Sequence, residues 1–190
     1  LRDLYLSLAY YVEDPRLMSE LAARYDSNFA TLDPELFTYI VAAKMLEHED
    51  EVFPQLLTAY PGATDPELRS NLLHCLALAR QPEHLAQLVN LLDQPDFVRP
   101  QDHIFLFIFL LRNPRSRTKT LDWTVTHWDY IKQLTGDKSL EDYVKYLGAV
   151  LRTSEEAAKF SAFFAAFRED PIIKRALEIA QTEIDARINL

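Results

Sequence analysis

The sequence predicts an all-α fold of stacked antiparallel helix pairs, of the HEAT or armadillo kind and with about eleven helices. Apolar residues recur at i, i+3, i+4 and i+7, the spacing of one helical face, and strand-like alternation is absent over any useful length. Three segments show the spacing: Leu68, Leu72, Cys75, Leu76 and Ala79; Phe160, Phe163, Phe164 and Phe167; and Ile173, Leu177, Ala180, Ile184 and Ile188.

A run of eight apolar residues at 104–111 supports the same fold class. The run is too short to span a bilayer, which needs about 20 residues. Pro100 opens the segment and Pro114 follows it, so we expect a helix that is buried on nearly every side. A helix hidden in this way needs other helices around it.

Proline spacing indicates the repeat. Pro34, Pro66 and Pro100 follow one another at spacings of 32 and 34 residues, about one helical hairpin each. In such arrays each helix pair buries its apolar face against the next pair. No break in composition marks a boundary, so we predict a single helical-repeat domain over residues 1–190.

Prolines also predict where most helices begin. Proline suits the first helical position, because its missing N–H would be unpaired there, and a preceding Asp or Asn can cap the other N–H groups. Seven prolines stand before a helical pattern: Pro15, Pro34, Pro66, Pro82, Pro100, Pro114 and Pro171. We therefore expect helices over 2–13, 15–29, 34–47, 50–60, 66–79, 82–93, 100–112, 114–134, 139–151, 154–168 and 171–188.

Two of the expected helices have a different basis. The helix over 2–13 follows from the amphipathic pattern of Leu4, Leu8, Tyr11 and Val12. The helix over 50–60 contains Pro54, which we expect in its first turn, where a proline costs little.

Composition excludes several classes of function. With 48% hydrophobic and 26% charged residues the chain is expected to be globular, and its net charge of −9 disfavours a nucleic-acid partner. Three glycines leave no phosphate-binding loop. The only cysteine, Cys75, excludes a disulfide framework and a thiolate zinc site, and the cytoplasm is the simplest compartment. No membrane partner is expected.

Side chains that could carry chemistry are few. The five histidines do not show the His-Glu-x-x-His spacing of zinc peptidases. His48 stands in an acidic run, 47–51, which we interpret as a solvated helix start. Cys75 lies on an apolar face and is expected to be a core thiol. Trp123, Trp128 and Tyr130 could line a groove, but aromatic residues at helical spacing usually form core. No catalytic, metal or cofactor residue is predicted.

Motifs in the second half carry a family resemblance. In order they are Thr64-Asp65-Pro66, the VRPQD segment at 98–102, LRNPRSR at 111–117, and LDWTVTHWDYI at 121–131. With TSEE at 153–156 and the Phe163-Phe164 pair, they resemble the C-terminal helical domain of aminopeptidase N-type zinc aminopeptidases, in the bacterial branch. The resemblance covers roughly residues 32–190. His127-Trp128 replaces the family's Asn-Trp pair, and Asn189-Leu190 replaces its terminal Trp-Leu.

The resemblance implies a superhelical bowl that leans over a preceding catalytic domain of the same chain and closes a chamber for peptide substrate. Zinc and its ligands belong to that preceding part, so no catalytic residue transfers to this sequence and the fragment alone is expected to be inactive. The chain begins at Leu1 inside an amphipathic pattern, so we expect a C-terminal piece of a larger multidomain enzyme.

One basic cluster is a candidate for substrate access. Arg112, Arg115, Arg117 and Lys119 lie across a predicted interhelical turn. A solvated turn is the simpler interpretation, since cations are favourable near the end of a helix. The functional hypothesis is that Arg112, Arg115 or Arg117 attracts peptide carboxylates.

Two alternatives stay open. A stand-alone HEAT-like scaffold would bind a protein through its concave face and would need no catalytic domain. A helical-repeat enzyme acting on nucleic acid is disfavoured by the acidic charge.

Overall fold

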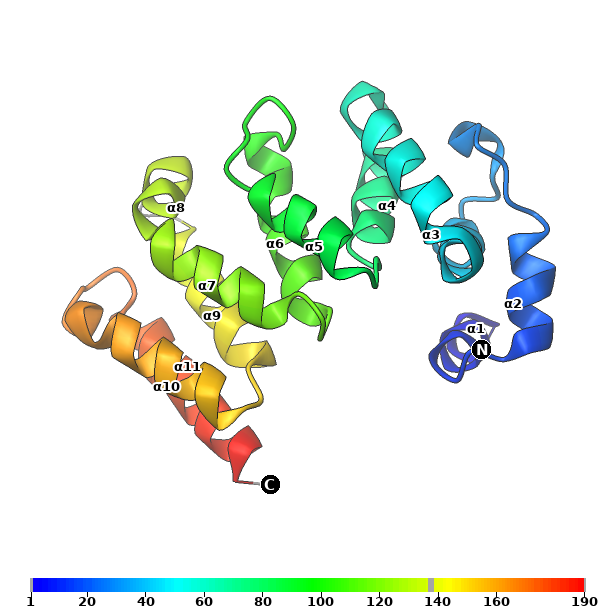
Figure 1. Cartoon of the computed structure of the whole chain (residues 1–190). Coiled ribbons are helices and arrows are strands. Elements are labelled where there is room, and N and C mark those ends of the chain that lie inside the picture. Colours follow the sequence, from blue (N-terminus) through cyan, green and yellow to red (C-terminus); the bar gives the residue numbers. More distant parts are fainter. Residues whose placement is uncertain (1, 137–138, 190) are drawn as a thin grey trace. The chain divides into compact units, whose positions relative to one another are not determined.

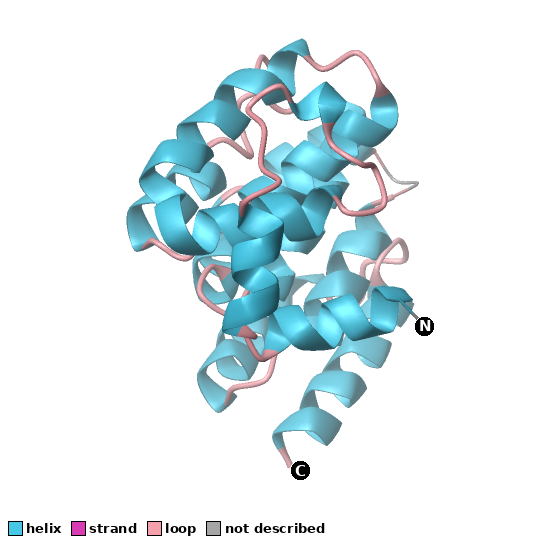
Figure 2. Ribbon diagram, turned by 90° about the vertical axis from the view of Figure 1, so that its right-hand side faces the viewer, coloured by secondary structure: helices cyan, strands magenta, loops and turns pink. Residues whose placement is uncertain are grey.

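The computed structural model describes residues 2–136 and 139–189, and every regular element in these ranges is a helix (Figures 1 and 2). The all-α prediction is therefore confirmed, with eleven α-helices and two short 3₁₀ helices in the described part of the chain. Leu1, and Leu190 of the expected terminal pair, lie outside the described residues. No described helix is both long enough and apolar enough to cross a lipid bilayer.

The chain divides into two compact units, Leu1–Leu88 and Val89–Leu190. The helices of the first unit are α1 (Arg2–Tyr11), α2 (Pro15–Ala22), η1 (Phe29–Thr31), α3 (Phe37–Gly62), α4 (Pro66–Leu76) and most of α5 (Pro82–Asn90). In this unit α3 packs against α1, α2 and α4.

The second unit holds the remaining helices in two rows. They are α6 (Pro100–Arg112), α7 (Arg117–Thr126), α8 (Trp128–Thr135), α9 (Leu140–Val150), α10 (Ser154–Phe164), η2 (Ala165–Phe167) and α11 (Lys174–Ile188). One row is formed by α6, α9 and α11, with α9 in the middle, and the other contains α7 and α10. Contacts of α6 with α7 and of α10 with α11 join the rows.

Four prolines begin helices as predicted: Pro15, Pro66, Pro82 and Pro100. Two of these helices carry an aspartate cap. Asp14 accepts a hydrogen bond from the backbone N–H of Leu17 at 3.0 Å, and Asp65 accepts one from Leu68 at 2.7 Å. The side chain thus satisfies an N–H of the first turn that no helical carbonyl can reach.

The three other prolines that were expected to begin helices, Pro34, Pro114 and Pro171, begin a turn instead. The predicted helix starts were wrong at these positions by three residues. The helices begin at Phe37, Arg117 and Lys174 instead of at Pro34, Pro114 and Pro171. The physical reason is common to all three, because the residue before the proline bonds to an N–H two positions ahead instead of three. These Asx turns run from Asp33 to Glu35 (3.0 Å), from Asn113 to Arg115 (2.9 Å) and from Asp170 to Ile172 (2.9 Å).

The break expected between residues 47 and 50 is present. The two expected helices are continuous in α3, but His48 has non-helical dihedral angles (φ −142°, ψ 53°) and kinks it. Pro54 lies within the second half of α3, in the first helical turns after the kink.

The prediction of a single helix over 114–134 is wrong, because this segment is divided into α7 and α8 at His127 (φ −119°, ψ 23°). The backbone N–H of His127 donates to the Trp123 carbonyl at 2.9 Å, and His127 Nδ1 lies 3.0 Å from the same oxygen. The imidazole also stacks on the Trp123 indole, with ring centroids 4.7 Å apart. These contacts hold His127 against the preceding turn and end the helix.

The helix expected over 15–29 ends early, at Ala22. Asp26 accepts a hydrogen bond from the backbone N–H of Asn28 at 2.8 Å, which stabilises a turn before η1. The apolar run at 104–111 behaves largely as predicted. Most of its side chains are buried in the second unit, whereas Ile104 and Phe109 are half-buried and Phe105 is 49% exposed.

Candidate functional site

The turn between α6 and α7 carries the arginines predicted for substrate access. Arg112 is the last residue of α6 and Arg115 lies in the turn, and both are exposed. The turn itself is well ordered by hydrogen bonds: Asn113 accepts from Arg115, and the buried Ser116 hydroxyl donates to the Leu110 carbonyl at 2.6 Å. Arg112 and Arg115 therefore stand on a fixed backbone with their charges in solvent.

Arg117 has different surroundings. Its side chain is half-buried, and its Nε donates to the Leu111 carbonyl at 3.1 Å, at the C-terminal end of α6. Burial lowers the pKa of Arg117, the nearby Glu156 carboxylate opposes this, and the charges of Arg152 and Arg187 lower it further. The three predicted arginines are therefore not equivalent, because Arg117 caps a helix end while the other two face solvent.

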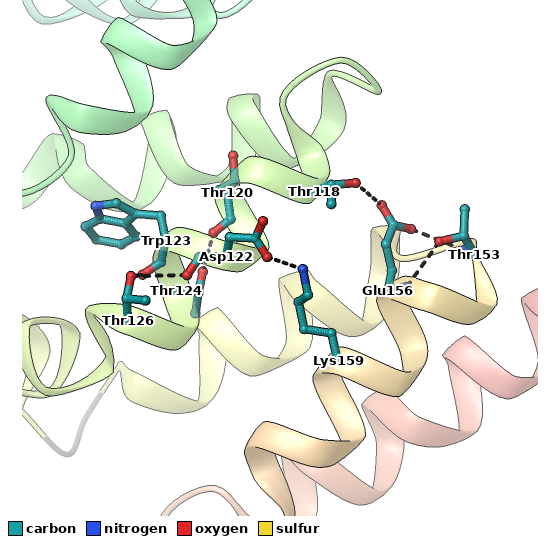
Figure 3. A network of polar contacts seen from close by, with 9 residues as sticks. All are labelled: Thr118, Thr120, Asp122, Trp123, Thr124, Thr126, Thr153, Glu156 and Lys159. Atoms are coloured by element: carbon teal, nitrogen blue, oxygen red, sulfur yellow. Dashed lines mark hydrogen bonds and ion pairs between the residues drawn. The ribbon is translucent and has the colours of Figure 1, made fainter.

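Glu156 is the carboxylate beside Arg117, and only 4% of it is exposed. It accepts hydrogen bonds from the backbone N–H groups of Arg152 (2.9 Å) and Thr153 (3.2 Å), while the Thr153 hydroxyl accepts from the Glu156 N–H at 3.1 Å. This reciprocal capping box begins α10. Thr118 of α7 donates to the other oxygen of Glu156 at 3.2 Å, so the same carboxylate also joins α7 to α10 (Figure 3).

Arg187 completes the group from the end of α11. Its Nη1 donates to the carbonyls of Gly148 (2.8 Å) and Leu151 (2.9 Å), which end α9. We call Arg117, Arg152 and Arg187, together with Glu156, the arginine edge. Glu183 also lies 3.8 Å from Arg187 Nη2, so three cations and two carboxylates leave a small excess of positive charge here. Such a setting favours the binding of carboxylates.

A second polar link between α7 and α10 lies along the same face (Figure 3). Asp122 accepts a hydrogen bond from Lys159, and this bond raises the pKa of the Lys159 ammonium group. On α7 the buried hydroxyls of Thr120 and Thr124 donate to the carbonyls four residues earlier, at 2.9 and 2.7 Å. These groups form their hydrogen bonds within and between the two helices.

The acidic run at 47–51 is partly a buried structural site, which corrects its interpretation as solvated. Glu49 is 9% exposed and accepts hydrogen bonds from the backbone N–H groups of Arg80 and Gln81, at 2.9 and 3.0 Å. Its Oε1 also lies 2.9 Å from His84 Nδ1. Glu49 thus caps the start of α5 from another helix. Sequence reasoning missed it, because the donors lie some thirty positions away.

Metal-ligand and nucleophile candidates are few in the described residues. Within residues 2–136 and 139–189, no group of three or more His, Cys, Asp or Glu side chains is placed to hold a metal ion. Cys75 is completely buried, and burial raises the pKa of its thiol, so the expectation of a core thiol is confirmed. Trp123 and Trp128 are also buried, as their interpretation as core residues requires.

A groove of about 530 Å³ lies between α10 and α11. Phe160 and Phe164 line its apolar part, and the ion pair of Lys174 with Glu169 (2.7 Å) lies at its polar part. Its lining carries charges of both signs.

Comparisons with known proteins identify relatives of this chain. The family model for the ERAP1-like C-terminal domain matches residues 1–186. Aminopeptidase N of Lactococcus lactis subsp. cremoris (strain MG1363) is 27% identical over 195 residues, which cover 100% of this chain and 23% of that protein. Aminopeptidase N of Lactobacillus delbrueckii subsp. lactis is 21% identical, over 90% of this chain and 20% of that protein. The probable aminopeptidase 2 of Sulfurisphaera tokodaii is 23% identical, over 76% of this chain and 19% of that protein. The chain spans less than a quarter of the length of these relatives.

Proposed function

Because the chain belongs to the family of ERAP1-like C-terminal domains, we propose that it is the C-terminal domain of a larger zinc aminopeptidase. The observation that carries the proposal is the match over residues 1–186, together with relatives that are named aminopeptidases and are more than four times as long. In this proposal residues 1–190 form one helical-repeat domain, and the parent enzyme removes N-terminal residues from peptides in the cytoplasm.

The proposed role of the domain is to cover the active site and shape peptide access. Closing a chamber over bound peptide excludes water and orients the substrate, a gating role that needs no catalytic side chain. The described residues do not fit a zinc site, since they provide no cluster of three metal ligands. The zinc, which would activate water for hydrolysis, would therefore be held in the preceding catalytic domain.

Arg112 and Arg115 are the proposed contacts to substrate on this domain, with Arg117 holding the turn in place. Both exposed guanidinium groups stand on a backbone fixed by the Asn113 and Ser116 hydrogen bonds. A peptide that enters the chamber by its N-terminus leaves its C-terminal carboxylate outside the catalytic centre, where such cations could bind it.

The test uses the full-length parent enzyme with both residues reversed, Arg112→Glu and Arg115→Glu. The substrates are peptides of several lengths, each with a free and with an amidated C-terminus. We expect the variant to lose most of the wild-type preference in kcat/KM for the free carboxylate. The control is Arg175→Glu on the exposed side of α11. An unchanged preference in the double variant would refute the arginine role.

A separate measurement tests the assignment to an aminopeptidase. We expect the parent enzyme to release N-terminal residues and to lose that activity with a metal chelator, while purified residues 1–190 cleave nothing. Robust cleavage by the fragment would overturn the proposal. An inactive parent that captures a protein through its helical surface would favour the scaffold alternative.

A further inference from the structure

The first helix of the chain is apolar on two opposite faces. Leu6 and Ala9 are buried, at 8% and 7% exposure, on the side where α1 packs against the first unit. Tyr5, Leu8 and Tyr11 follow one another every three residues on the other side, and are 65%, 56% and 84% exposed. A helix that is hydrophobic all round is normally buried in its protein.

Val12 follows α1 directly and is 67% exposed. We call Tyr5, Leu8, Tyr11 and Val12 the α1 face. Among the described residues, seven large hydrophobic side chains are exposed, and four of them belong to this face. Scattered single exposures are normal on a protein surface, whereas a contiguous group of this kind indicates an interaction surface.

The last helix provides the contrast. The exposed side of α11 carries mainly charged and polar residues: Lys174, Arg175, Glu178, Thr182, Glu183 and Asp185. Ile179, 44% exposed, is the large apolar residue among them. In a stacked array each pair buries its face against its neighbour, and a terminal pair needs a polar outer side. By this criterion α11 has the surface of a terminal helix and α1 has the surface of an internal one.

A shallow groove of about 270 Å³ lies beside α1 in the same unit. Leu6, Leu17, Leu21 and Leu36 provide its apolar lining, with Glu20 and Arg24 at its polar part. The groove meets α1 at Leu6, on its packed side, and so lies apart from the α1 face.

We propose that the α1 face is the docking surface for an amphipathic helix that precedes Leu1 in the same polypeptide. The occupant is a helix because each described element that packs in this unit is helical, and a stripe at spacings of three and four residues matches the ridges of helix-on-helix packing. It is supplied by the same polypeptide because the relatives extend over more than four times the length of this chain. The inference rests on the proposed function only in assuming a longer parent chain.

The direct test is photo-crosslinking in the full-length parent protein. A benzophenone amino acid replaces Tyr11, and in a matched control it replaces Ile179 on α11. After irradiation and digestion, we expect position 11 to crosslink in high yield to a single peptide from the segment before Leu1. We expect position 179 to give little or no crosslink. These results do not depend on peptidase activity, so an inactive parent would refute the proposed function and leave this inference standing.

Two results would overturn the inference. One is a crosslink from position 11 to a second copy of the protein, which would disappear on dilution and identify a dimer interface. The other is a crosslinking yield at position 11 as low as that at position 179, which would mean that the α1 face stays in solvent.

A second measurement compares Leu8→Glu with Ile179→Glu in the same full-length protein. A carboxylate at position 8 would enter an apolar interface, so we expect Leu8→Glu to lower the Tm by several degrees and to speed amide exchange in α1 at least tenfold. Ile179→Glu should change neither. Equal behaviour of the two variants would contradict the proposed docking surface.

Discussion

Gly148 of α9 lies directly against Ala180 of α11. A Cβ atom built on Gly148 would stand 2.5 Å from both the Cα and the Cβ of Ala180, which is closer than non-bonded carbon atoms approach. Gly148 and Ala180 are both buried, and the contact lies between the two most closely packed helices of the second unit. The absence of a side chain at position 148 is therefore what allows α9 and α11 to pack this closely.

We predict that Gly148→Ala destabilises the protein, although alanine favours helix formation. The added methyl group would push α9 and α11 apart, and overpacking of this kind costs about 1–3 kcal/mol. Gly62→Ala is the matched control, because nothing lies within 4 Å of a Cβ at Gly62. Urea unfolding of both variants checks the prediction. Equal stabilities would mean that the two helices adjust at no cost.

Glu49 is predicted to hold the start of α5. Glu49→Gln keeps the shape of the side chain but removes the charge that strengthens its bonds to the N–H groups of Arg80 and Gln81. We expect a loss of about 1–3 kcal/mol in the free energy of unfolding, with faster amide exchange at the start of α5. Glu51→Gln, at an exposed position nearby, should have little effect. If exchange in α5 were unchanged in Glu49→Gln, the capping role would be wrong.

Arg187 is predicted to act through its geometry as well as its charge. Its Nη1 donates to two carbonyls at the end of α9, and lysine cannot reproduce that planar arrangement. Arg187→Lys should therefore lower the free energy of unfolding by about 1–2 kcal/mol. Arg175→Lys, on the exposed side of α11, serves as the control. Thermal unfolding at low and high salt checks this, because lysine keeps the charge and a loss of hydrogen-bond geometry should persist at high salt.

His103 is predicted to make stability depend on pH. The ring is 1% exposed, its Nδ1 lies 2.7 Å from the Tyr143 hydroxyl, and burial lowers the pKa of His103 to about 4. In the unfolded chain the pKa of histidine is near 6.5. Between these values the unfolded state binds the extra proton, so stability falls as the pH is lowered through this window. The expected loss is roughly 3 kcal/mol, complete below about pH 4.

Denaturant unfolding of the wild type and of His103→Phe at several pH values checks this prediction. Carboxylates also titrate near pH 4, but their contribution is common to both proteins, so the difference between the two curves reports on His103. We expect the variant to have a shallower decline between pH 6.5 and 4. Parallel curves would mean that His103 is accessible to protons in the folded protein.

The sequence predicts which segments are helical better than it predicts the residues at which the helices begin and end. The prolines at 15, 66, 82 and 100 begin helices because proline and its preceding residue act within one turn of backbone. The same reasoning placed three starts too early, at Pro34, Pro114 and Pro171. Asp precedes prolines of both groups, and its carboxylate can bond to the N–H three positions ahead, as Asp14 does, or two positions ahead, as Asp33 does. The residue type alone does not decide between a helix cap and an Asx turn.

The candidate site was predicted only in part. Arg112, Arg115 and Arg117 were recognisable as a basic cluster, but their different surroundings were not. Arg117 is distinguished by Glu156 and Arg187, which lie 39 and 70 positions further along the chain. No periodicity or spacing rule relates residues so far apart, so the arginine edge appears only when the helices are packed.

The sequence by itself determined the helical class, the break near His48, the internal position of the 104–111 run and the family resemblance. These follow from interactions within a few turns of chain and from the period of the apolar residues. The tertiary structure alone decided that Glu49 caps α5, that Gly148 meets Ala180, and that Arg117 lies near Glu156, Arg152 and Arg187. Such contacts depend on where distant helices come to lie, and that is set by the packing of whole side-chain surfaces.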